Sequence, residues 1–432
     1  MRLLFGVVNA ADNVKHESDQ PYMASLINHN VYVAIGPLVT SEAAYDATDV
    51  IYHLSQTNLN LALLESKKTL LTQITDADLK LRHPILQLSA GVGGQLYNLP
   101  TFTPNAAGNV RTAGLNLEGN EIDFNAIITP WVNSFVAISN DSDNISLALS
   151  SGFLTIGNLN ASPIYFSLGE MNVPFAYSPT ALSTAALPAS MMTINTPTVL
   201  LGYSKNNFMA AIYGYTGSEV VGGSSPIPQA GAETYYTLFF GENAQDSCKI
   251  GVGVLTNVAD AGGFQNTYYA TNEGQFGGFD QSGSSNNLAH SVSGGDINVK
   301  ILAGRWKFMA EYVASLRQFS VQDLSFDNHG AAPQAARIEA RYSPAFIPKK
   351  HGAFIGAAWD HTMQALELNF EKNKYAFFFN VAIWRATGFK LEYDRQQDYG
   401  TSQTGSGLGA TAPIIGTDKG INAVSVELWV YF

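Results

Sequence analysis

Apolar and polar residues alternate along most of this chain. In 122–128, apolar residues occupy every second position: Ile122, Phe124, Ala126 and Ile128. Successive side chains of a β-strand point to opposite faces, so a period of two predicts strands with one apolar face. Short polar turns such as 204–207 join neighbouring segments, which predicts antiparallel hairpins.

The same alternation continues to the end of the chain and predicts about sixteen strands. They are expected at 86–97, 113–128, 131–139, 145–158, 163–171, 198–204, 207–216, 233–242, 248–257, 295–303, 305–317, 334–343, 352–362, 374–384, 388–395 and 421–432.

Short and long connections alternate between these strands, and only 140–144 breaks the rule. The long connections are 98–112, 172–197, 217–232, 258–294, 318–333 and 396–420. A soluble β-sandwich has no reason to collect its long loops at one end, whereas an outer-membrane barrel does. We therefore predict an all-β protein, a transmembrane antiparallel β-barrel of the bacterial outer membrane, with long loops outward and both termini periplasmic. Because such barrels normally have an even number of strands, the alternating segment 364–370 is assigned to a loop.

The last predicted strand, INAVSVELWVYF (421–432), alternates up to Phe432. A closed barrel has no free edge, so this strand must pair with the first one. An aromatic terminal strand is similar to the signal by which outer-membrane proteins are recognised for assembly. The expected partners are therefore the barrel-assembly machinery, outer-membrane lipid and lipopolysaccharide.

Composition narrows the classes of function. The net charge of −12 argues against a nucleic-acid partner, because no basic stripe is present. The sequence contains no run of about 18 apolar residues, so it predicts no transmembrane helix. Cys248 is the single cysteine, so no internal disulfide or cysteine-based metal site is expected. The eight histidines show neither HExxH spacing nor a nucleophile–base pattern, and we predict no enzyme activity, no cofactor and no metal.

The first 85 residues differ from the rest. Residues 1–10 are interpreted as the remnant of a signal peptide, and 86–432 as the barrel. Residues 11–85 form an extension that is periplasmic or lumenal and is expected to be helical or irregular. Within it Leu59, Leu63, Leu70 and Ile74 have roughly helical spacing.

The strand faces predict where the charges point. A Lys or Arg on the lipid face near the midplane costs about 2–4 kcal/mol, so charges of opposite parity to the apolar residues should face the lumen. The candidate lumen and solute-binding residues are Lys300, Lys307, Glu311, Arg337, Glu339, Arg341, Lys390, Glu392 and Glu427. They form either a wetted wall that neutralises itself or a mixed-charge track for a polar or anionic solute.

The loop 172–197 is the third outer loop if 98–112 is the first and the short connection 140–144 is the second. It is rich in proline and alanine and nearly free of charge. In sixteen-stranded porins the third loop commonly folds inward and narrows the pore. An ordinary surface loop is the alternative.

Three segments resemble one family. They are YDATDVIYHLSQTNLNLALLESKK (45–68), IYFSLGEMNVPFA (164–176) and MQALELNFEKNKYAFFFNVAIWRATGFKLEYDR (363–395). They are similar to segments of the legiobactin-receptor-like (LbtU) siderophore porins of Gram-negative bacteria. The resemblance implies uptake of a ferric siderophore through the outer membrane, by passive passage that needs no TonB box.

Other functions fit the same pattern. A general or anion-selective porin is one alternative, and an adhesin or structural barrel with functional surface loops is another. The oligomeric state stays open between monomer and trimer.

Overall fold

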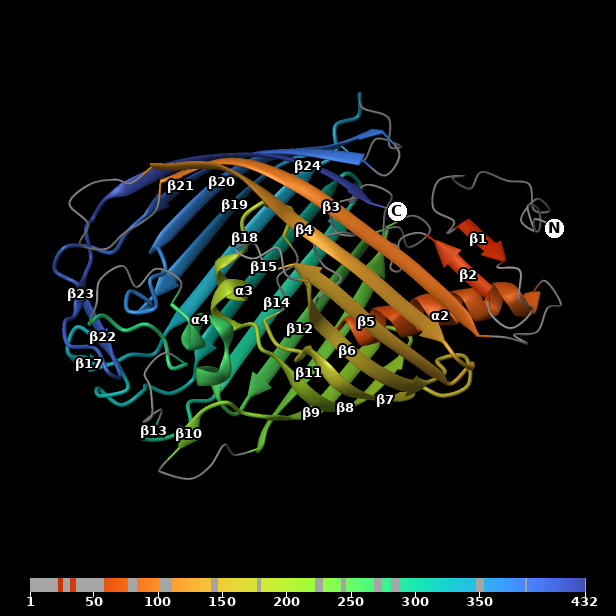
Figure 1. The fold of residues 1–432 in the computed structure, drawn as a ribbon, viewed down its shortest axis with the longest axis horizontal. Helices are drawn as coiled ribbons and strands as arrows, with labels where there is room; N and C mark the ends of the chain where they lie inside the picture. The colour runs from red at the N-terminus through yellow and green to blue at the C-terminus, as the bar shows by residue number, and fades with distance from the viewer. Residues whose placement is uncertain are drawn as a thin grey trace.

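The computed structural model describes residues 22–25, 32–35, 58–76, 84–100, 111–140, 147–176, 180–221, 228–241, 246–267, 274–280, 287–346, 353–384 and 387–431. Within these residues one sheet of eighteen strands dominates, and all of its strands except β1 and β2 form a closed antiparallel barrel (Figure 1). In order around the barrel these are β3 (Ile85–Pro100), β4 (Arg111–Ile127), β5 (Val132–Asn140), β6 (Leu147–Gly157), β7 (Ile164–Asn172), β8 (Asn195–Lys205), β9 (Phe208–Thr216), β11 (Pro228–Phe240), β12 (Asp246–Leu255), β14 (Gly294–Ala303), β15 (Trp306–Ser315), β18 (Gln334–Tyr342), β19 (Phe354–Met363), β20 (Asn373–Trp384), β21 (Thr387–Gln397) and β24 (Gly420–Tyr431).

The last strand closes the barrel on the first. β24 pairs antiparallel with β3, from Val424 opposite Asn98 to Tyr431 opposite Gly91. Each predicted strand coincides with one of the observed barrel strands, and 364–370 lies in a loop. The predicted fold class and strand number are therefore confirmed. Phe432 and residues 1–21, which include the predicted signal-peptide remnant, lie outside the described residues.

The outer face of the barrel is apolar. In β9, Phe208 and Ile212 are exposed, while Met209, Ala211 and Tyr213 between and beyond them are buried. Exposed aromatic residues gather at the short turns, where Trp306 lies 4.7 Å from Tyr342 between ring centroids. An apolar band with an aromatic belt is the outer surface of an outer-membrane barrel.

The N-terminal extension contains one helix and two strands. Helix α2 (Leu59–Asp76) confirms the helix that the spacing of its leucines predicted. Strands β1 (Tyr22–Ser25) and β2 (Tyr32–Ile35) pair with each other, and β2 runs parallel to Ile85–Leu88 of β3. The prediction of a helical or irregular extension was therefore wrong for these two strands.

The edge of β3 explains the position of β2. The pairing of β24 with β3 spans Gly91 to Asn98, so it leaves residues 85–88 without a neighbour on that side. An open strand edge is a template for pairing, and β2 occupies it. Pairing with this edge, more than any alternation of its own residues, accounts for the four-residue strand β2.

Smaller elements occupy the end of the barrel where the long loops lie. β16 (Leu324–Phe326), β17 (His329–Gly330), β22 (Thr404–Gly407) and β23 (Ile414–Ile415) form a four-stranded sheet, and β10 (Val220–Val221) pairs with β13 (Asn287–Leu288). α3 (Leu187–Met192), the 3₁₀ turn η2 (Val258–Asp260) and α4 (Gly262–Gln265) lie closer to the middle of the barrel. In Figure 1, β22 and β23 lie at one end of the molecule and α2 lies toward the other. No helix among the described residues is long and apolar enough to cross a bilayer.

Candidate functional site: the barrel interior

Helix α2 lies inside the barrel, against the inner face of β5, β6 and β7. We call this the helix-covered wall. Lys67 donates from its Nζ to Asn133 Oδ1 (3.0 Å) and to the carbonyl oxygen of Gly157 (2.8 Å). Asn60 Nδ2 donates to Ser167 Oγ at 3.0 Å. Asn133, Gly157 and Ser167 are inward-facing strand residues, so these contacts place the helix in the lumen.

Apolar side chains complete the docking of α2. Leu59 and Leu63 are buried in one cluster with Phe135, Phe153 and Met171 of the helix-covered wall. Burial of a leucine side chain contributes roughly 1.5–3 kcal/mol. The helical spacing of the leucines therefore serves an interior surface of the barrel.

The helix enters from the end of the barrel that carries the short turns. Thr72 Oγ1, near the end of α2, lies 3.5 Å from Asn160 Oδ1 in the turn between β6 and β7. At the other end of the helix, Asn58 Nδ2 donates to Glu233 Oε2 (2.7 Å) in the middle of β11. A helix of this length spans roughly 27 Å at ~1.5 Å per residue, so it reaches from the rim into the lumen.

The described parts of the connection between β7 and β8, residues 173–176 and 180–194, also fold into the lumen. We call this connection the inner loop. Val173 and Phe175 are completely buried at its start, and Met191 and Met192 at its end. These residues pack in the same core cluster as Leu61 and Leu64 of α2. The described parts of the third outer loop therefore narrow the interior, and the alternative of an ordinary surface loop is excluded.

The inner loop contacts the inner face of β18–β21. We call this face, together with the adjoining inner face of β24, the loop-covered wall. Asn380 Nδ2 donates to Ala181 O at 3.0 Å. Lys374 Nζ donates to Thr184 Oγ1 (2.6 Å) and Ala185 O (3.1 Å). A buried backbone group without a partner is costly, so a loop inside a barrel needs such donors. Wall side chains supply them.

Arg337 is the centre of an ion-pair network on this wall. Its Nη1 lies 2.8 Å from both carboxylate oxygens of Asp360, and its Nη2 donates to Glu339 and, at 2.5 Å, to Thr180 Oγ1 of the inner loop. Arg341 donates from Nε to the other oxygen of Glu339. Both arginines are almost fully buried, so the network is shielded from bulk water. Charges that are paired in this way fix the position of Thr180.

A second group of charges continues along β21 and β24. Glu392 accepts hydrogen bonds from the backbone N–H of Ser183 and from the hydroxyl of Thr184. Lys390 Nζ lies 3.6 Å from Glu427 Oε2 and 3.5 Å from Leu182 O. The wall therefore binds the inner loop along several consecutive residues.

The structure brings most of the predicted lumen residues together. Six of them are buried on the loop-covered wall: Arg337, Glu339, Arg341, Lys390, Glu392 and Glu427. Glu311 on β15 is buried and pairs in register with Arg337. Lys300 and Lys307 are half-buried on β14 and β15, and Lys307 lies opposite Arg341. This arrangement is a wall that neutralises itself and holds a loop, while the part of these nine residues in binding a solute stays a prediction.

Sequence reasoning missed several residues of this interior. Lys374 and Asp360 have the parity of inward residues on their strands, so that signal was available. Thr180, Thr184 and Lys67 lie in a loop and a helix, where alternation gives no information. His361, next to Asp360, faces outward and stacks on Trp359 at 5.6 Å between ring centroids. Within the described residues no group of three or more His, Cys, Asp or Glu side chains could hold a metal ion.

Comparison with known proteins gives the relatives of this chain. A UPF0422 protein of Legionella pneumophila (strain Lens) is 30% identical over 98% of this chain and 82% of its own length. A UPF0422 protein of Coxiella burnetii (strain RSA 493) is 28% identical over 94% of this chain and 84% of its own. No protein-family model matches the sequence.

Solved structures with a similar fold include two outer-membrane proteins. OmpT of Vibrio cholerae is 11% identical, with a TM-score of 0.49, over 82% of this chain and 99% of that one. OmpF of Salmonella typhi, in complex with daunomycin, is 11% identical with a TM-score of 0.49, over 80% of this chain and 97% of that one.

The identity and coverage shared with the Legionella relative show that the chain belongs to the UPF0422 family.

Proposed function

We propose that this protein is an outer-membrane channel for small polar solutes, whose interior is obstructed at rest by α2 and the inner loop. One observation carries the proposal: an apolar outer surface encloses an interior lined with Arg, Lys, Asp and Glu. Charged residues inside a transmembrane structure are costly and commonly mark a solute pathway. We place the long loops on the outer side of the membrane and the short turns on the periplasmic side.

The interior polarity exceeds what packing alone needs. Buried ion pairs are weak support for stability, because apolar residues of similar volume often stabilise as well. The buried carboxyl group of Glu311 lies against that of Asp296, and the buried carboxyl group of Asp123 lies against that of Glu121. Carboxyl groups buried side by side are costly in a dry interior, and a barrel used only as a scaffold has no need of them. These groups favour a channel over an adhesin or structural barrel.

For the solute itself we propose an anionic ferric siderophore that passes without energy coupling. Lys300 and Lys307 are half-buried cations of the interior, and Arg341 lies in register beside Lys307. Movement of the inner loop would uncover Arg337 and Lys390 as well, because both contact that loop. The resemblance to siderophore porins supports the same class of solute.

Single-channel recording on refolded full-length protein tests the proposal. The wild type is compared in planar bilayers with a variant in which residues 180–186 are replaced by a short Gly-Ser linker. We expect small or rare openings of the wild type and steady conductance of the variant. Ferric citrate, a carboxylate chelate, should block the open variant, and iron-free citrate should not.

The outcomes separate the two levels of the proposal. Folded protein that conducts in neither form, even after residues 58–76 are also removed, would overturn the channel. Steady conductance that ferric citrate does not alter would overturn the siderophore and leave a channel for another polar solute.

A further inference from the structure

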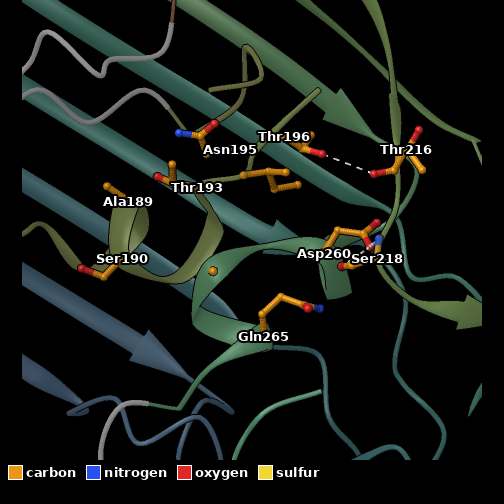
Figure 2. Close-up of a pocket in the computed structure, with 11 residues that line it drawn as sticks. Ala189, Ser190, Thr193, Asn195, Thr196, Thr216, Ser218, Asp260 and Gln265 are labelled. Atoms are coloured by element: carbon orange, nitrogen blue, oxygen red, sulfur yellow. Dashed lines mark hydrogen bonds between the residues drawn. The ribbon is translucent and has the colours of Figure 1, made fainter. Parts of the chain in front are cut away.

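A pocket of about 550 Å³ lies at the long-loop end of β8 and β9. Its sides come from three parts of the chain: α3, the ends of the two strands, and the segment of η2 and α4 (Figure 2). Pockets of roughly 300–1,000 Å³ hold small organic ligands. The pocket is separate from the network of Arg337 and has its own chemistry.

Close packing of α3 and α4 forms the base of the pocket. Gly262 N donates to Thr193 O at 2.9 Å, which fixes the start of α4 against the end of α3. A Cβ atom at Gly263 would lie 2.7 Å from both Met191 Cα and Ser190 O, so glycine permits this approach. The walls are therefore held by backbone contacts.

Seven of the eleven described lining residues carry neutral polar side chains. Five residues contribute hydroxyls: Ser190, Thr193, Thr196, Thr216 and Ser218. Asn195 and Gln265 add side-chain amides. Such groups both donate and accept hydrogen bonds without carrying charge.

Part of this polar surface is available for a ligand. Thr196 Oγ1 makes only a long contact of 3.4 Å with Thr216 O. The hydroxyls of Ser190 and Thr193 form no hydrogen bond with other residues in the described ranges, and both residues are partly exposed. Figure 2 shows these two side chains on the α3 side of the pocket.

Asp260 is the one charged residue among the described residues that line the pocket. It is buried, and its Oδ1 accepts hydrogen bonds from Ser218 N (2.8 Å), Ser218 Oγ (3.2 Å) and Glu219 N (3.2 Å), while its Oδ2 accepts one from Asn257 Nδ2 (3.1 Å). These bonds hold the carboxylate in one orientation, and Oδ2, with its one donor, keeps the capacity to accept from a ligand. No basic side chain lies among the described lining residues to attract an anion.

We propose that this pocket binds a small neutral saccharide. Hydroxyl groups of the sugar would donate to Asp260 and exchange hydrogen bonds with the hydroxyls of Ser190 and Thr193. A buried carboxylate without a cation disfavours anionic ligands, so this ligand differs in class from an anionic chelate. The inference goes beyond the proposed channel and stands without it.

Isothermal titration of the folded full-length protein with maltose tests the proposal. The protein is kept in a zwitterionic detergent, because alkyl glycosides would compete for the pocket. We expect saturable binding, and a loss of about threefold to tenfold in affinity for each of Ser190→Ala and Thr193→Val. Thr401→Val changes the same residue type at an exposed site and should bind like the wild type.

A second variant keeps the test decisive if the first two disturb the loop. A Cβ atom at Gly262 would lie 3.6 Å from Thr193 O, which is an ordinary contact, so Gly262→Leu fills the pocket without a backbone clash. It should abolish binding. Unchanged binding in Gly262→Leu, or no binding of maltose to the wild type, would overturn the proposal. Tighter binding of gluconate or glucosamine than of glucose would overturn the neutral class of ligand.

Discussion

The two covered walls of the barrel interior differ in what holds the covering segment. The helix-covered wall is largely neutral, and α2 packs on it through leucines and a few hydrogen bonds. The loop-covered wall carries Arg, Lys, Asp and Glu, and these side chains bind backbone groups of the inner loop. A helix satisfies its own backbone and needs apolar contact, whereas an irregular loop needs partners for its N–H and C=O groups. The kind of segment therefore determines the chemistry of the wall beneath it.

Replacement of Arg337 should have the largest effect. Arg337→Met leaves Asp360 and Glu339 buried without their shared cation and removes a donor to Thr180. Breaking a buried pair from one side costs about 3–5 kcal/mol. We expect the inner loop to detach, which would be measured as faster hydrogen exchange of residues 180–192 and higher conductance. Arg317→Met, at an exposed loop position, is the matched control, and equal exchange in the two variants would contradict a special role for the network.

A truncation in α2 should come next and affect the other wall. Leu63 is fully buried among Phe135, Phe153 and Met171, and Leu63→Ala should weaken helix docking by about 2–5 kcal/mol. Hydrogen exchange of residues 59–76 reports on docking. Leu70→Ala, at a half-buried position of the same helix, should have a smaller effect. Detachment of the inner loop to the same degree as the helix would show that the two walls are one cooperative unit.

We expect the docking of α2 to depend on pH through Lys67, and the docking of the inner loop not to. Burial lowers the pKa of Lys67 from 10.5 to about 8 in the docked helix. Below pH 8 both docked and free helix carry the proton, and the penalty of burying the charge is fully present. Between about pH 8 and 10.5 only the free helix keeps the proton, so docking should strengthen as pH rises.

Hydrogen exchange of residues 59–76 across this pH range, corrected for intrinsic rates, measures the effect. Lys67→Met should remove the trend. A trend that persists in Lys67→Met would assign it to another group. Residues 180–192 should show no such dependence, because the two hydrogen bonds of Lys67 go to Asn133 and Gly157 on the barrel strands and not to the inner loop.

The smallest effect is expected for Glu392→Gln. Ser183 N and the Thr184 hydroxyl donate to different oxygens of Glu392, so the amide keeps an acceptor for one of them and loses the charge that strengthens these hydrogen bonds. We expect about 1 kcal/mol of weaker loop docking, visible as modestly faster exchange at 182–185. A loss as large as that of Arg337→Met would mean that Glu392, rather than Arg337, anchors the loop.

Much of the interior could be predicted from the sequence, and the rest could not for identifiable reasons. The parity of Arg337, Glu392 and Lys390 places them inside, since a lipid-facing charge is costly. Their partners are hidden from such reasoning. Thr180 is 159 residues from Glu339, and Ser183 is 209 residues from Glu392. No local pattern in either segment indicates the other.

The sequence by itself determined the strands, their faces and the number that closes the barrel, because alternation is a local property that each strand carries. Only the tertiary structure decided what fills the barrel. The inner loop, α2 and β2 find their places through the surfaces that closure creates, namely the charged wall, the neutral wall and the open edge at residues 85–88 of β3. Such surfaces exist only after strands far apart in sequence have paired.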